Sequence, residues 1–195
     1  WPTPLASVHG LMKNMEKEIK KGRIRYIGVS NYDVRLMEKA REALSFSDIV
    51  SNQLHYNLIT RGVEEDGVIQ HCHRNGISLI AWSPLEQGLL TGKYQHKAKV
   101  RDARRLRPAF TRGHLARLEP LLSTLEEMSR RHGRTVAQGA LAWILQQDMN
   151  IVIPGVKHRE QLEENAGGQG WRFTSEEMDK IGEAYRAYHR LHHLG

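Results

Sequence analysis

The chain has 195 residues, 39% of them hydrophobic and 26% charged, which is typical of a globular protein and excludes a disordered chain. It contains no run of 18 apolar residues, so we expect no membrane partner. The formal net charge of +7, much of it between Lys97 and Arg117, favours either a solvated basic loop or an anionic ligand.

The first half of the chain alternates between helical and strand patterns. Apolar residues at helical spacing predict a helix over residues 5–21, which Gly22 ends. We expect Ser30 or Asn31 to cap the helix that follows the first strand. Further amphipathic and β-rich segments predict strands at 24–29, 48–54 and 77–82 and helices at 33–44 and 63–74.

The second half continues the same alternation. A basic loop occupies residues 95–112, and a short strand over 151–153 is ended by Pro154 and Gly155. Thr135 is the expected cap of the helix predicted at 136–147. Helices are predicted at 114–131, 136–147, 159–166 and 175–188. No linker divides the chain, so we expect a single domain.

Strands that alternate with helices predict an α/β fold with a parallel sheet. Each strand is apolar on consecutive residues, which is typical of strands covered by helices. Four strands suit either an open doubly wound sheet or part of a (β/α)8 barrel, because a whole barrel takes roughly 250 residues. In both folds, functional groups gather at the carboxyl ends of the strands.

Two amides and an indole occupy the predicted strand ends. Asn31 and Gln53 can each donate and accept hydrogen bonds, as a carboxamide ligand requires. Trp82 offers a flat face to a planar ring. Each residue also has a purely structural interpretation. Asn31 can cap a helix, Gln53 can bond to buried backbone groups, and Trp82 can be a core residue. Only their occurrence together at successive strand ends favours a nicotinamide site.

Two segments suit phosphate groups. Ser83 and the backbone amides around Leu85 to Gly88 can meet a phosphate, and glycine allows its close approach. Lys157 and Arg159 lie where a helix begins, which also favours an anion. With the amides and the indole, these segments predict a site for a nicotinamide dinucleotide. No GxGxxG is present, so this site is not of the Rossmann type.

Five segments resemble the aldo-keto reductase family, in the family's order. Residues 22–31 (GRIRYIGVSN) resemble its GKIRxIGVSN segment, and residues 82–94 (WSPLEQGLLTGKY) resemble its YSPLxxGxLTGKY segment. Further similarities lie at 52–57, 138–143 and 153–165. The resemblance covers most of the chain. It implies the last four strand–helix units of a partial (β/α)8 TIM barrel.

The resemblance also implies NADP(H) as the cofactor. By position, Ser30, Asn31 and Gln53 would hold the nicotinamide carboxamide, and Trp82 would stack on its ring. The residues implied along the pyrophosphate and the adenosine end are Ser83, Leu85, Gly88, Lys93, Gly155, Lys157, Gln161, Glu164 and Asn165. The cation at Lys157 favours NADPH over NADH, since a 2′-phosphate is a dianion.

The basic loop over 95–112 would fold over the cofactor. Its arginines are alternatives for a phosphate contact, and the sequence does not choose among Arg101, Arg104, Arg105 and Arg107.

The family reduces aldehydes and ketones by hydride transfer, with a Tyr as proton donor and Lys, Asp and His beside it. All four lie upstream of the segments that this chain matches. Trp1-Pro2 resembles the pair that follows the catalytic His. No tyrosine of the chain matches the catalytic one, so we assign no catalytic residue and expect the chain to be inactive alone. Metal binding is not expected, because His71, Cys72 and His73 point to different faces of a helix.

The remaining expectations concern partners and location. A carbonyl compound is the substrate implied for the complete protein. The terminal strands would be unpaired edges, which favours self-association or pairing with an N-terminal half. A non-catalytic NADPH-binding regulatory subunit is the alternative function. A nucleic-acid binder lacks zinc-finger and RNA-binding patterns, so we expect none. One cysteine, Cys72, suits a reducing, cytoplasmic location.

Overall fold

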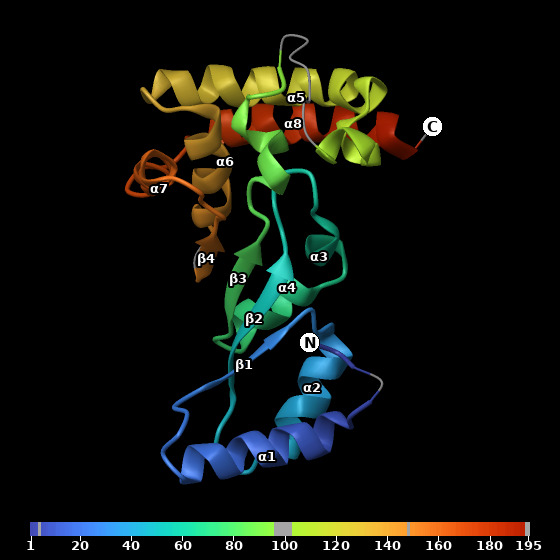
Figure 1. Cartoon of the computed structure of the whole chain (residues 1–195), viewed down its shortest axis with the longest axis vertical. Coiled ribbons are helices and arrows are strands. Elements are labelled where there is room, and N and C mark those ends of the chain that lie inside the picture. Colours follow the sequence, from blue (N-terminus) through green and yellow to red (C-terminus); the bar gives the residue numbers. More distant parts are fainter. Residues whose placement is uncertain (4, 96–102, 148, 194–195) are drawn as a thin grey trace. The chain divides into compact units, whose positions relative to one another are not determined.

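The computed structural model describes residues 1–3, 5–95, 103–147 and 149–193. Four parallel strands form one sheet in the order β1-β2-β3-β4 (Figure 1). Their bounds are Ile27–Ser30, Ile49–His55, Ser78–Trp82 and Asn150–Ile153. The predicted α/β fold with a parallel sheet is therefore present.

The chain divides into two compact units, which we describe separately. The sheet unit comprises Trp1–Tyr56, Thr60–Trp82 and Met149–Ile153. The helical unit comprises Asn57–Ile59, Ser83–Asp148 and Pro154–Gly195. The helices of the sheet unit are α1 (Val8–Lys20), α2 (Val34–Ala43), α3 (Gly62–Glu65) and α4 (Val68–Arg74).

Two predictions about these helices were wrong. The segment 63–74 is not one helix, because Gly67 takes a φ of 73° between α3 and α4, a conformation that glycine adopts without steric cost. The cap of α2 is Asp33, whose carboxylate accepts a hydrogen bond from the backbone N–H of Leu36 at 2.7 Å. Of the expected caps, Ser30 donates its hydroxyl to β2, and the Asn31 side chain accepts a hydrogen bond from Trp82 of β3.

One face of the sheet is packed against helices and holds the core of this unit. Ile27, Leu79 and Ala81 are fully buried there, and Leu54 is 3% exposed. A bulge inserts Val50 into β2, so that both Ile49 and Leu54 still point to the buried face.

The other face of the sheet is open. Its side chains are all partly or largely exposed, and Ile151 and Ile153 of β4 are 46% and 44% exposed. The consecutive apolar residues of the strands had indicated cover by helices, which holds for one face only. The residues of the open face are Ser30, Ser51, Gln53, His55, Ser78, Ile80, Trp82, Ile151 and Ile153.

The helical unit is built around two long helices that lie side by side, α5 (Arg112–Arg131) and α8 (Ser175–His193) (Figure 1). Its other elements are η1 (Glu86–Thr91), η2 (Ala103–Leu106), η3 (Pro108–Phe110), α6 (Val136–Leu145) and α7 (Arg159–Ala166). Thr135 caps α6 as predicted, and the Gln138 side chain completes a reciprocal capping box.

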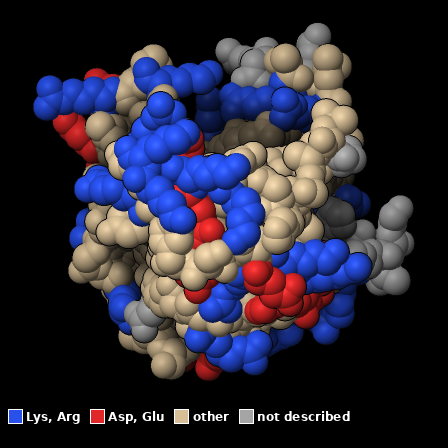
Figure 2. All heavy atoms as spheres, turned by 90° about the horizontal axis from the view of Figure 1, so that it is seen from below, with Lys and Arg blue, Asp and Glu red and all other residues tan. Residues whose placement is uncertain are grey.

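Basic side chains give the surface its charge. On the face drawn in Figure 2, Lys and Arg cover visibly more area than Asp and Glu, in line with the net charge of +7. Among the described residues, no helix is long and apolar enough to cross a membrane.

Candidate functional site

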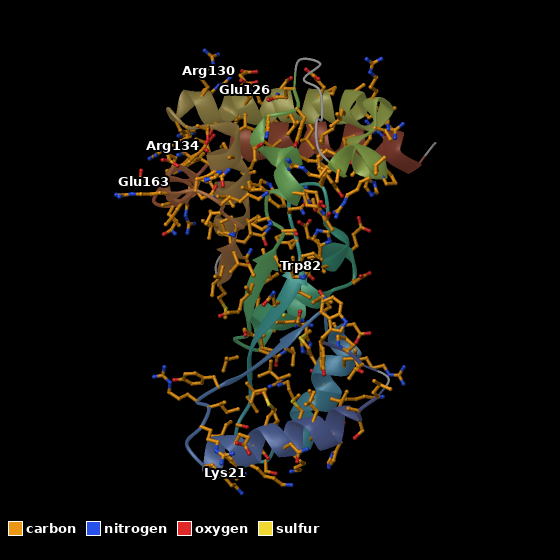
Figure 3. The ribbon with its side chains drawn as sticks, viewed as in Figure 1. Lys21, Trp82, Glu126, Arg130, Arg134 and Glu163 are labelled. Atoms are coloured by element: carbon orange, nitrogen blue, oxygen red, sulfur yellow. The ribbon has the colours of Figure 1, made fainter. Side chains whose placement is uncertain are left out.

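The ends of β1, β2 and β3 bring four predicted site residues together within the sheet unit. Ser30 is the register partner of Gln53. The Gln53 carbonyl accepts hydrogen bonds from the backbone N–H of Asn31 at 2.9 Å and from the Ser30 hydroxyl at 3.0 Å. The indole N–H of Trp82 donates to the Asn31 side-chain oxygen at 3.2 Å. Figure 3 shows Trp82 beside the end of β3.

In the described part of the chain, the side-chain amide of Asn31 has its oxygen bonded and its NH2 group unbonded. Its φ is 52°, in the left-handed region that asparagine tolerates better than most residues. Because the Trp82 indole can only donate, the Asn31 atom that faces it must be the oxygen. The Asn31 amide NH2 then has no hydrogen-bond partner among the described residues, and neither has the Gln53 side chain. The Asn31 amide donor and the whole Gln53 carboxamide are therefore without a described partner at the ends of these strands.

His55 completes this cluster, and the sequence analysis missed it. Its ring stacks on the Trp82 ring with centroids 4.0 Å apart and planes 10° apart. The two residues are register partners in β2 and β3. The signal was present in the spacing, since His55 follows Gln53 by two residues and must face the same side of the sheet.

The segment after β3 forms a tight loop in the helical unit. Ser83, Glu86 and Gln87 have φ values of 51°, 42° and 54°, and Gly88 has 97°. The amides of Glu86 and Gly88 donate within the loop, to the carbonyls of Ser83 and Leu85, at 2.9 Å each. These two amides are therefore bonded within the loop, and the assignment of Leu85 and Gly88 to a phosphate stays a prediction.

Two arginines of the basic segment fold onto this loop. Arg104 donates to the Gln87 carbonyl at 2.7 Å, and Arg107 donates to the Gln87 side chain. The Arg104 guanidinium also lies over the rings of Tyr94 and Phe110 at 5.6 and 5.8 Å. Arg101 and the Arg105 side chain lie outside the described residues.

The first turn of α6 contacts both predicted phosphate segments. A Cβ on Gly92 would lie 3.2 Å from the Val136 side chain, so the loop after β3 ends against α6. The Gln138 amide donates to the Glu164 carbonyl near the end of α7 at 2.9 Å. In the helical unit, the segment 83–93 and α7 therefore both contact α6.

The predicted adenosine residues gather around α7. The backbone N–H of Lys157 donates to the Gln161 side chain at 2.8 Å, which fixes the turn before the helix. The Lys157 side chain is exposed, with no hydrogen bond or ion pair to another described residue. Arg159 instead pairs with Glu163 at 2.8 Å. Gly155, Glu164 and Asn165 lie in the same segment, where Gly155 has open space around it.

Four of the six tyrosines are buried, and a fifth lies at the far end of β1. Tyr32, Tyr56, Tyr94 and Tyr188 are at most 5% exposed. Burial raises the pKa of Tyr32, and it raises the pKa of Tyr188 to about 12. Tyr26 is 70% exposed but precedes β1, at the opposite end of the strand from Asn31. The absence of a proton donor from the chain stays a prediction from the sequence.

Comparisons with known proteins agree with the resemblance. The sequence profile of the Aldo/keto reductase family matches residues 1–186. An uncharacterized oxidoreductase of Mycobacterium tuberculosis is 35% identical over 187 residues, covering 96% of this chain and 57% of the relative. The chloroplastic pyridoxal reductase of Arabidopsis thaliana is 35% identical over 161 residues, covering 82% and 43%.

A solved structure gives the same match. An aldo-keto reductase from Klebsiella pneumoniae in complex with NADPH aligns with a TM-score of 0.74 and 25% identity, covering 95% of this chain and 56% of that one. The chain thus spans about half the length of the proteins that it matches.

Proposed function

The chain belongs to the aldo/keto reductase family, and from this premise we propose that it is the cofactor-binding portion of an NADP(H)-dependent oxidoreductase. The complete protein would reduce aldehydes or ketones to alcohols. The four strands then correspond to the last four strand–helix units of a (β/α)8 barrel. The names of the relatives and the NADPH held by the K. pneumoniae protein support this proposal.

The observation that carries the proposal is the cluster of Asn31, Gln53 and Trp82. A nicotinamide carboxamide has one carbonyl to accept a hydrogen bond and one NH2 to donate. Asn31 offers a donor, since its oxygen is already bonded to the indole, and Gln53 offers an acceptor. The donor set of the open face therefore fits the carboxamide, and Trp82 offers a flat surface to the ring.

The bound nicotinamide would supply the hydride, while the residues of this chain bind and orient it. Ser30 supports the carboxamide pair through its hydrogen bond to the Gln53 carbonyl. In the helical unit, we assign Ser83, Leu85, Gly88 and Lys93 to the pyrophosphate. Lys157 is the cation assigned to the adenosine 2′-phosphate, because its charge has no described partner.

Cofactor titrations of the chain test this function. NADPH is expected to quench Trp82 emission, and Trp82→Phe should remove that part of the quenching. Lys157→Ala should weaken NADPH binding about tenfold and leave NADH binding nearly unchanged, because it removes one charged contact to the 2′-phosphate. A wild-type chain that binds neither dinucleotide would refute the proposal.

A matched control separates this effect from general loss of charge. Lys180 is a partly exposed lysine of the helical unit that pairs with Glu176 at 2.7 Å on α8. Lys180→Ala is expected to leave the affinity for both dinucleotides unchanged. An equal loss of NADPH affinity in Lys157→Ala and Lys180→Ala would show that only long-range charge attracts the cofactor.

A further inference from the structure

His55 and Trp82 form a parallel ring stack in the sheet unit. Their centroid separation of 4.0 Å and interplanar angle of 10° mean that the imidazole covers one face of the indole. The stack joins the last residues of β2 and β3, where the backbones are hydrogen-bonded in register. The covered face of Trp82 is therefore closed to any other flat ring.

A second contact holds the indole at its edge. The indole N–H donates to the Asn31 side chain at 3.2 Å, so Trp82 is tied to the segment after β1 as well as to β2. A hydrogen bond in the ring plane and a stack on one face together oppose rotation about both side-chain torsions of the tryptophan. Trp82 is partly exposed, and its register partner on the other side, Ile153 of β4, is 44% exposed.

We propose that His55 is a positioning residue that holds Trp82 with a single face available to the nicotinamide ring. This inference rests on the proposed function, because it assigns the open face of the indole to that ring. His55 need not touch the cofactor: it acts by removing the orientations of Trp82 that do not present this face. A tryptophan side chain that is already ordered loses less conformational entropy when a ligand binds.

The stack is tested first without cofactor, by near-ultraviolet circular dichroism of the chain. The part of the near-ultraviolet spectrum that disappears in Trp82→Phe is the band assigned to Trp82. His55→Ala should lose most of that band, because the indole becomes free to rotate. His55→Phe should keep it, because a phenyl ring can stack in the same place. An unchanged Trp82 band in His55→Ala would overturn the positioning role, whatever the chain binds.

The second measurement is NADPH affinity of the same variants. We expect His55→Ala to weaken binding about five- to tenfold and His55→Phe to restore it to within about twofold, because an aromatic stack contributes a modest part of the affinity. Wild-type binding separates the two claims. If wild type binds no NADPH, the proposed function fails, while the spectra still decide the stack. If wild type and His55→Ala bind equally well, His55 does not position Trp82.

The two substitutions also control for folding. A purely structural role of His55 would lower the melting temperature of His55→Ala and His55→Phe alike, because both remove the imidazole. Rescue by phenylalanine of both the spectrum and the affinity is the result expected from positioning. Failure of His55→Phe to restore either one would overturn the proposal.

Discussion

A single carboxylate fixes one turn of the sheet unit. Glu16 of α1 is 4% exposed, and its Oε1 accepts hydrogen bonds from the backbone N–H groups of Ser45 and Phe46 at 2.6 and 3.0 Å and from the Ser47 hydroxyl at 3.2 Å. The Phe46 N–H above all, with the Ser45 N–H and the Ser47 hydroxyl, lowers the pKa of Glu16 to about 2 against the opposing effect of burial. The carboxylate thus stays charged and anchors the loop between α2 and β2 to α1.

This anchor has a defined pH dependence. The pKa of Glu16 in the folded chain lies below the ordinary value of 4.5, so its stabilising effect is complete above pH 4.5 and is lost as the pH falls toward about 2. Glu16→Gln should lower the melting temperature by several degrees at pH 7, and the gap to wild type should narrow below pH 4.5. In an NMR titration, the amide protons of Ser45 and Phe46 should shift with a midpoint near 2.

Glu18 provides the comparison on the same helix. It forms exposed ion pairs with Lys21 and Arg23 at 2.9 Å, and exposed pairs contribute little to stability. Glu18→Gln should therefore change the melting temperature much less than Glu16→Gln does. A midpoint near 4.5 for the Ser45 and Phe46 amides would contradict the assigned role of Glu16.

The sequence predicted the residues at strand ends better than their hydrogen bonds. The positions of Asn31, Gln53 and Trp82 followed from where each apolar run stops, and the structure brings all three together. The loop after β3 was harder, because Glu86 and Gln87 adopt positive φ values that their residue types do not suggest. Its internal amide bonds depend on that backbone conformation.

At the scale of elements, α5 and α6 approach closely at a glycine. A Cβ on Gly139 would lie 1.9 Å from the Ser129 hydroxyl and 3.3 Å from the Leu125 side chain. Ser129 cannot easily move, since it is fully buried and donates to the Leu125 carbonyl at 2.7 Å. The packing of the two helices therefore requires the absence of a side chain at position 139.

Gly139→Ala should destabilise the helical unit by about 1–3 kcal/mol, the usual cost of overpacking a core. Gly113, in the first turn of α5, has no atom within 4 Å of its added Cβ. Gly113→Ala should be neutral or stabilise by up to about 1 kcal/mol, since alanine has less freedom in the unfolded chain. Urea denaturation of both variants, followed by circular dichroism, measures the difference. Equal stabilities would show that α5 and α6 separate at no cost.

Element types and order could be predicted because helices and strands have different apolar periods. The break at Gly67 was missed, because apolar residues continue at helical spacing on both sides of it. The open face of the sheet was also missed. A run such as Ile151-Val152-Ile153 shows that both faces of a strand are apolar, but it does not show whether another element covers each face.

At the scale of the whole sheet, β2 and β3 are paired on both sides, whereas β1 and β4 are edges among the described strands. Exposed edges offer unpaired N–H and C=O groups to another chain. The exposed Ile151 and Ile153 lie on the open face of one such edge. These features favour the prediction that the sheet pairs with a further copy or with a separate N-terminal half.

Hydrogen exchange tests that expectation directly. In an isolated chain, the amides of β2 and β3 should exchange about tenfold or more slowly than those of β1 and β4, because only the inner strands are bonded on both sides. Equal protection of all four strands would mean that the edges are paired. Sedimentation velocity at the same concentration then identifies the partner, since pairing between copies gives a dimer. Equal protection in a chain that sediments as a monomer would contradict the half-barrel proposal.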